Sequence, residues 1–203
     1  MILLAGQPFI DTRLSFNSFL PEKLPKSISE KLVDHWVETL RNRPELHDKV
    51  EFEVAITSYS FDLERKMSQL IGSVLDEKEK KIFKRALHRL TKKLLSKKGK
   101  YSISYSLDKI EKLNNLNNTR KLKDKKNFLK NIEKMIDDCI NFGTTYFSIL
   151  ARHGFIAKTF LNSLKSLKIL NENQINIIEG SVDTVAGKLV DDIIKLKSKL
   201  INI

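Results

Sequence analysis

The sequence predicts an α+β domain that is mostly α-helical, with a small two-stranded (or slightly larger) sheet covered by six to eight helices. Residues 50–59 alternate apolar and polar side chains, and residues 9–20 do the same. Such alternation is typical of a strand with one buried face. Most of the remaining chain repeats apolar residues at helical spacing. We therefore expect residues 1–203 to form a single helical module, with any internal boundary between residues 96 and 120.

One helix is predicted between the two strands, and the other helices follow the second strand. Trp36 lies on the apolar stripe of the first helix, which Pro44 ends. Further helices are predicted over residues 62–72, 76–94, 107–113, 122–143, 144–154, 155–164 and 171–200. Residues 97–100 and the asparagine-rich residues 114–118 are predicted connections. Gly143 is expected to end a helix in the left-handed conformation.

The net charge of +12 is concentrated in one region. Residues 78–134 hold 20 basic and 5 acidic side chains, a net of +15, whereas the remainder holds 17 basic and 20 acidic ones, a net of −3. Such a helical patch attracts phosphates through counterion release. The candidate polyanion-binding residues are Lys80, Lys81, Lys84, Arg85, Lys92 and Lys93. The alternative is a solvated lysine-rich face, because aromatic side chains that would stack on bases are scarce here.

The polar face of the predicted sheet is the second candidate site. If the two strands pair, Arg13 lies near Glu51 or Glu53. An arginine held by carboxylates binds phosphate or carboxylate with two parallel hydrogen bonds, and paired carboxylates can hold magnesium. The candidate substrate- or phosphate-binding residues are therefore Asp11, Arg13, Asn17, Glu51 and Glu53. The alternative is a set of cross-strand ion pairs beneath a covering helix.

Several classes of protein are not indicated by the sequence. No glycine-rich phosphate loop and no nucleophile elbow are present. His88 has no ligand partner at helical spacing, and a metal site needs two or more such ligands on one face, so no metal site is predicted. No stretch approaches the roughly 18 consecutive apolar residues of a membrane helix. The single cysteine excludes an internal disulfide and is typical of the reducing cytoplasm, where we expect this protein.

Several strings of residues resemble the central helical region of phosphoenolpyruvate synthase-like proteins, which are multidomain, PEP-utilising and related to pyruvate phosphate dikinase. They are GQPFIDTRLSFNSF at residues 6–19, LHDKVEFE at 46–53, SYSFDL at 58–63, FGT at 142–144 and ARHGFIA at 151–157. The resemblance spans nearly the whole chain, is strong up to about residue 62 and is diffuse over residues 78–134.

The resemblance implies a fragment of a larger ATP-dependent phosphotransferase. In that family an ATP-grasp domain binds ATP and magnesium, and a swivelling domain carries a phosphohistidine. Neither domain is recognisable in this chain. The resemblance therefore implies no catalytic residue here and no cofactor bound by this chain alone. The expected role is a scaffold or acceptor-side module that is not active by itself, with those two domains as partners in cis or in trans. The alternative is a basic helical binding module for nucleic acid or another polyanion.

Overall fold

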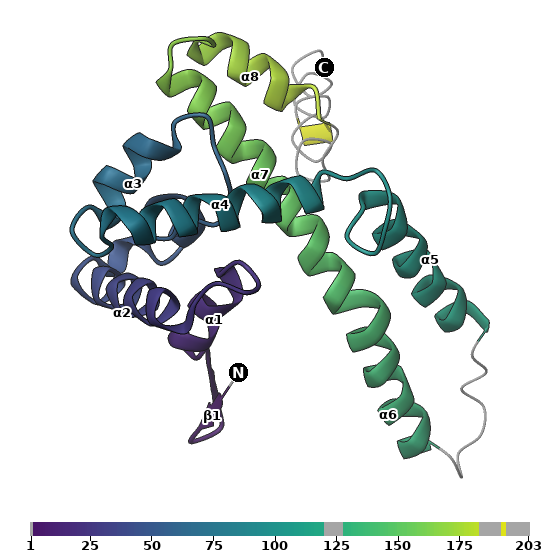
Figure 1. The fold of residues 1–203 in the computed structure, drawn as a ribbon. Helices are drawn as coiled ribbons and strands as arrows, with labels where there is room; N and C mark the ends of the chain where they lie inside the picture. Colours follow the sequence, from purple (N-terminus) through teal and green to yellow (C-terminus); the bar gives the residue numbers. More distant parts are fainter. Residues whose placement is uncertain (1, 120–127, 183–191, 194–203) are drawn as a thin grey trace, which may run out of the picture. The chain divides into compact units, whose positions relative to one another are not determined.

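The computed structural model describes residues 2–119, 128–182 and 192–193. The chain divides into two compact units, Met1–Phe160 and Leu161–Ile203. The boundary expected between residues 96 and 120 lies within the first unit. The described residues hold eight α-helices, which confirms the mostly helical prediction (Figure 1). Their bounds are α1 Thr12–Phe19, α2 Lys26–Asn42, α3 Leu63–Ile71, α4 Glu77–Leu94, α5 Ile103–Thr119, α6 Phe128–Asp138, α7 Thr145–Ser166 and α8 Glu172–Gly180.

The predicted sheet between residues 9–20 and 50–59 is wrong. The strands of the described chain are β1 (Ile2–Leu4) and β2 (Gln7–Phe9), three residues each, which pair as an antiparallel hairpin. Ala5 and Gly6 both have positive φ angles at its turn, as a tight two-residue hairpin turn requires.

The first predicted strand is mostly helix α1, because Asp11 caps it. The carboxylate of Asp11 accepts a hydrogen bond from the backbone N–H of Leu14 at 2.9 Å, which satisfies an amide that the first turn leaves without a partner. Phe16 is buried and Phe19 is partly buried, three residues apart on one side of the helix, whereas Leu14 is exposed. The alternation of apolar and polar residues at 9–20 therefore does not mark a strand, since most of this stretch is a short helix.

The second predicted strand begins instead as a π-helical turn, Val50–Val54, in which the N–H of Ala55 donates to the carbonyl of Val50 at 2.8 Å. The chain then runs through the core without regular structure. Val54, Ala55 and Ile56 are buried in succession, so both sides of the segment are covered. The N–H of Tyr59 donates to the hydroxyl of Thr91 on α4 at 2.9 Å. The hydroxyl of Thr91 thus takes the place of a neighbouring strand as hydrogen-bond partner for the backbone N–H of Tyr59.

The hydrophobic core lies among α1 to α4 and the segment after the π-helical turn. Trp36 of α2 is 0% exposed, and its ring centroid lies 5.8 Å from that of Phe16. Helix α4 begins with a capping box, in which the side-chain carboxylates of Asp76 and Glu79 each accept a hydrogen bond from the backbone N–H of the other residue. Phe83 and Leu87 of α4, both fully buried, complete the core.

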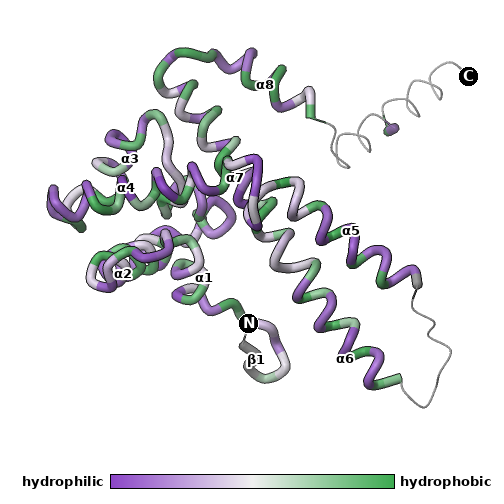
Figure 2. Tube along the Cα trace, turned by 45° about the vertical axis from the view of Figure 1, so that its right-hand side comes forward, coloured by the Kyte–Doolittle hydropathy of each residue, from purple (hydrophilic) through white to green (hydrophobic). Residues whose placement is uncertain are grey.

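Helices α5 and α6 form a separate part of the first unit, which we call the arm: α5, α6 and the π-helical turn Cys139–Thr144, labelled η4. In both views α5 runs beside α6 (Figures 1 and 2). The connection predicted at residues 114–118 is wrong, because these residues continue α5.

Gly143 does not end a helix, contrary to the prediction. It has no positive φ, and the chain continues from η4 directly into α7. A Cβ at this position would lie 3.0 Å from Cδ2 of Leu113. The absence of a side chain at Gly143 therefore allows α5 to approach closely.

The second unit contains the end of α7 and α8. Lys168 has a positive φ at the turn, and Lys165 forms an ion pair with Glu172 across it. Asn171 and Gln174 form the capping box that begins α8. The long helix predicted to residue 200 is described as α8 up to Gly180, and most of the rest of it lies outside the described residues. So do residues 122–127 of the helix predicted at 122–143. Within the described chain, no helix is both long and apolar enough to cross a membrane.

Candidate anion-binding cavity

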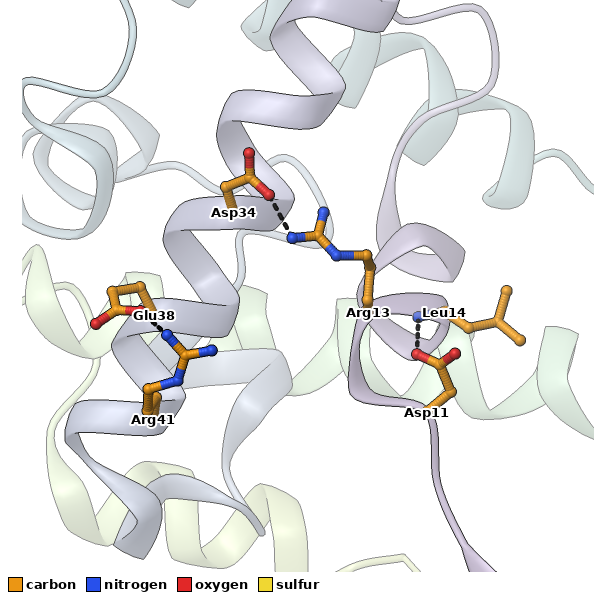
Figure 3. A network of polar contacts seen from close by, with 6 residues as sticks. All are labelled: Asp11, Arg13, Leu14, Asp34, Glu38 and Arg41. Carbon is orange, nitrogen blue, oxygen red and sulfur yellow. Dashed lines mark hydrogen bonds and ion pairs between the residues drawn. The ribbon is translucent and has the colours of Figure 1, made fainter. Parts of the chain in front are cut away.

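The five residues expected on a polar sheet face do not share one, since that sheet does not exist. Arg13 on α1 instead forms an ion pair with Asp34 on α2 at 2.5 Å, and Asp11 caps α1 (Figure 3). Asn17 is exposed on α1. Glu51 and Glu53 lie on the π-helical turn, Glu53 being exposed and Glu51 partly buried. Their role in binding substrate or phosphate stays a prediction.

A cavity of about 600 Å³ lies elsewhere in the first unit, between the end of α1, the second half of α4, Tyr101 and α7. Its lining combines aromatic and aliphatic side chains with three charged ones. The residues are Ser18, Phe19, Leu20, Glu22, Leu90, Lys93, Leu94, Tyr101, Phe147, Ser148, Ile149, Ala151, Arg152 and Phe155. A concave, largely apolar site with a few polar groups is the usual form of a small-molecule pocket.

Arg152 is one of the three charged residues that line this cavity. One of its terminal nitrogens donates to the backbone carbonyl of Ser18 at 2.7 Å. Burial lowers the pKa of Arg152, because removal from water disfavours the charged form. Among the described residues no carboxylate forms an ion pair with it. The guanidinium carries five N–H donors in a rigid fork, so most of them have no protein acceptor within the described chain.

The other two charges of the cavity neutralise each other. Nζ of Lys93 lies 3.1 Å from a carboxylate oxygen of Glu22 and 4.2 Å from the centroid of the Tyr101 ring. The hydrogen bond with Lys93 lowers the pKa of Glu22, and the same bond raises the pKa of Lys93. With this pair balanced, the lining carries one net positive charge, that of Arg152.

His153 fixes the stretch of α7 that carries Arg152. Its two ring nitrogens lie within hydrogen-bonding distance of two backbone carbonyls, Nδ1 at 2.8 Å from that of Ile149 and Nε2 at 2.9 Å from that of Leu94. The second contact joins α7 to the end of α4. Because Arg152 precedes His153 in the chain, this contact restricts where the guanidinium can lie.

Sequence reasoning gave Arg152 no role. It lies at residues 151–157, one of the strings on which the family resemblance rests, and that resemblance indicates no chemistry for this arginine. Its partner Ser18 is 134 positions away, and no spacing rule connects the two. Lys93 was predicted, but for polyanion binding on an exposed face and without Glu22.

The basic residues predicted on α4 lie on different faces of that helix. Three form ion pairs: Lys80 with Glu77, Lys84 with Glu64, and Lys93 with Glu22. Lys92 is exposed. A second hollow, of about 780 Å³, is lined by Tyr59, Lys81, Ile82, Lys84, Arg85, His88 and Arg89. We call it the α4 groove; its Arg89 was missed by the sequence prediction.

Among the residues that the structure describes, no three His, Cys, Asp or Glu side chains gather in a way that could hold a metal ion. The buried carboxylate of Asp62 accepts hydrogen bonds from Ser60 at 2.9 Å and Arg65 at 2.7 Å, a structural arrangement at the start of α3. Comparison with known proteins finds no matching family, no similar curated protein and no similar solved structure.

Proposed function

We propose that this chain is the central helical module of a phosphoenolpyruvate synthase-like, ATP-dependent phosphotransferase, in which it serves the acceptor side of the reaction. The observation that carries the proposal is spatial. Strings of residues that resemble this family lie far apart in the chain and are in contact at the cavity of Arg152.

Two contacts bring these strings together. Arg152, in the string at residues 151–157, donates to the carbonyl of Ser18, in the string at residues 6–19. Phe155 packs edge-to-face against Phe52, in the string at residues 46–53, with ring centroids 5.8 Å apart. Ser18, Arg152 and Phe155 all line the cavity. A function shared with the family would therefore be sought at this cavity.

The division of labour in this proposal leaves phosphate chemistry to other domains. ATP and magnesium would be bound by an ATP-grasp domain, and a phosphohistidine domain would carry the phosphate. This chain would hold the acceptor and would be inactive alone. Its own contribution is to position a ligand and to exclude water from it.

The test is reassembly with the proteins encoded next to this reading frame. We expect an ATP-grasp segment and a phosphohistidine domain there. The mixture should transfer phosphate from radiolabelled ATP to an acceptor only when this chain is present. Transfer that is unchanged when the chain is left out, or the absence of both domains from the neighbouring genes, would overturn the proposal.

The α4 groove supports a second candidate, a binding surface for nucleic acid. Lys81, Arg85 and Arg89 follow one another at spacings of four residues, so they share one face of α4. The rings of Tyr59 and His88 lie edge-to-face in the same groove, with centroids 5.3 Å apart. Cations beside aromatic rings suit the phosphates and bases of a single strand.

This candidate is tested by fluorescence anisotropy with labelled single-stranded RNA at several salt concentrations. Replacing both Arg85 and Arg89 by alanine should weaken binding and make the salt dependence less steep, by about one unit of slope for each lost phosphate contact. Arg41→Ala on α2 is the matched control, because Arg41 is exposed and lies outside the groove. Absence of binding at low salt would remove this candidate.

A further inference from the structure

We propose that the cavity around Arg152 is a binding site for a small monocarboxylate whose remainder is apolar or aromatic. The inference names the ligand class of the proposed acceptor-side module and rests on that function only for the ligand's role as acceptor. The binding itself follows from the charge, shape and lining of the cavity.

The charge of the cavity selects a single negative charge. Lys93 and Glu22 form an ion pair at one side, so the guanidinium of Arg152 is the charge left to be balanced. A monoanion brings the net charge of the partly buried site to zero. A phosphate dianion would leave one negative charge without a partner beside the apolar walls of the cavity.

The guanidinium also has the right form for a carboxylate. Arginine and carboxylate groups pair through two parallel N–H···O bonds. The bond to the carbonyl of Ser18 holds one terminal nitrogen of Arg152, and the other N–H groups have no acceptor in the described chain. The contact of His153 with α4 restricts the helix that carries it. A ligand would therefore find this arginine already oriented, which reduces the entropy cost of binding.

The apolar side chains that line the cavity indicate the chemistry of the ligand beyond its carboxylate. Phe19, Leu90, Phe147 and Phe155 line the cavity, and its volume of about 600 Å³ is in the range of ligand pockets. Phe147 is 68% exposed although it lines the cavity, so a bound apolar group would cover part of its ring. The site thus combines one cation with apolar walls, which matches an acid head on an apolar body.

The experiment is isothermal titration calorimetry with the full chain, without ATP or any other domain. The probes are phenylacetate and octanoate, the neutral phenylacetamide as a control for charge, and phenyl phosphate as a dianion. We expect saturable binding of at least one monocarboxylate. Phenylacetamide should bind roughly ten- to a hundredfold more weakly than phenylacetate, the usual loss for a charge-assisted hydrogen bond. Phenyl phosphate should bind no more tightly than phenylacetate.

Three variants locate the binding. Arg152→Gln should weaken it by a similar factor, and Arg152→Lys should restore part of the loss. Arg41→Gln is the matched control, because Arg41 forms its ion pair with Glu38 outside the cavity, and the affinity of this variant should stay within about twofold of the original. Ala151→Leu leaves Arg152 in place and fills part of the cavity, so it also should weaken binding, which keeps the test valid if the Arg152 variants do not fold.

The proposal is overturned if neither monocarboxylate binds, if phenyl phosphate binds more tightly than phenylacetate, or if folded Arg152→Gln or Ala151→Leu protein binds as well as the original chain. Because the titration needs no ATP and no partner domain, it separates this inference from the proposed function. Phosphate transfer that fails in the reassembled mixture counts against the acceptor role, whereas titration that fails counts against the ligand.

Discussion

The core among α1 to α4 and the arm of α5, α6 and η4 use the same kind of amphipathic helix with different results. In the core, Trp36 and Phe83 are each 0% exposed. In the arm, no residue of α6 is buried, and Phe128 and Leu129 are 53% and 76% exposed. Apolar positions recur along both sets of helices (Figure 2). An apolar stripe therefore does not decide how deeply a helix is buried.

The difference lies in how many neighbours cover each stripe. The stripe of α2 faces α1, the segment after the π-helical turn and other members of one cluster of buried side chains. Helix α6 continues into η4, and the described neighbour that packs against η4 is α5, whose Leu113 lies close to Gly143. One neighbour covers only part of a helix surface, so the hydrophobic contribution per residue is smaller in the arm.

The largest effect on the free energy of unfolding is expected when a phenylalanine of the core, rather than one of the arm, is replaced by alanine. Phe83→Ala in the core should lower the free energy of unfolding by about 3–5 kcal/mol, because it leaves a cavity among buried side chains. Phe128→Ala in the arm should change it by no more than about 0.5 kcal/mol, because that side chain is half exposed. Urea denaturation followed by circular dichroism measures both. Equal losses would show that the arm and the core are stabilised alike.

A smaller effect is expected from crowding the arm at Gly143. In Gly143→Leu the new side chain meets Leu113, so α5 should move away and its amide hydrogens should exchange faster. The core should keep its free energy of unfolding to within about 0.5 kcal/mol. Gly154→Leu is the matched control, because a Cβ there meets nothing within 4 Å. Hydrogen–deuterium exchange that rises equally in α5 and α4 would contradict the separation of arm and core.

The smallest effect concerns pH and the start of α4. Hydrogen bonds from the backbone amides of Glu79 and Lys78 lower the pKa of Asp76 below its ordinary value of 3.8. The carboxylate therefore stabilises the folded state fully above that value, and this stabilisation is lost as the pH falls through the lowered pKa. Asp76→Ala should reduce the melting temperature by roughly 2–4 °C at pH 7, and the difference from the original chain should shrink below about pH 4. Asp48 is exposed and does not cap a helix, so Asp48→Ala should show neither change. A difference that is constant down to pH 2 would mean that the charge of Asp76 has no part in the cap.

Local signals in the sequence determined most helices of this protein. These signals act over three to seven residues, so they can be recognised in the sequence before the fold is known. They are the apolar stripe around Trp36, the N-caps at Asp76 and Asn171 and the helix end at Gly72. Residues 9–20 and 50–59 misled the prediction, because a run this short can satisfy both the strand and the helix period. The N-cap at Asp11 was the available signal for a helix there.

Only the tertiary structure decided where the cavity lies and what charge it carries. The sequence supplies Glu22, Lys93 and Arg152 as three unremarkable charges spread over 131 positions. Packing of α7 against α1 and α4 brings them together, cancels two of them and leaves the third beside Ser18. The physical reason is that helix signals are local, whereas ion pairing and burial depend on contacts between segments far apart in the chain.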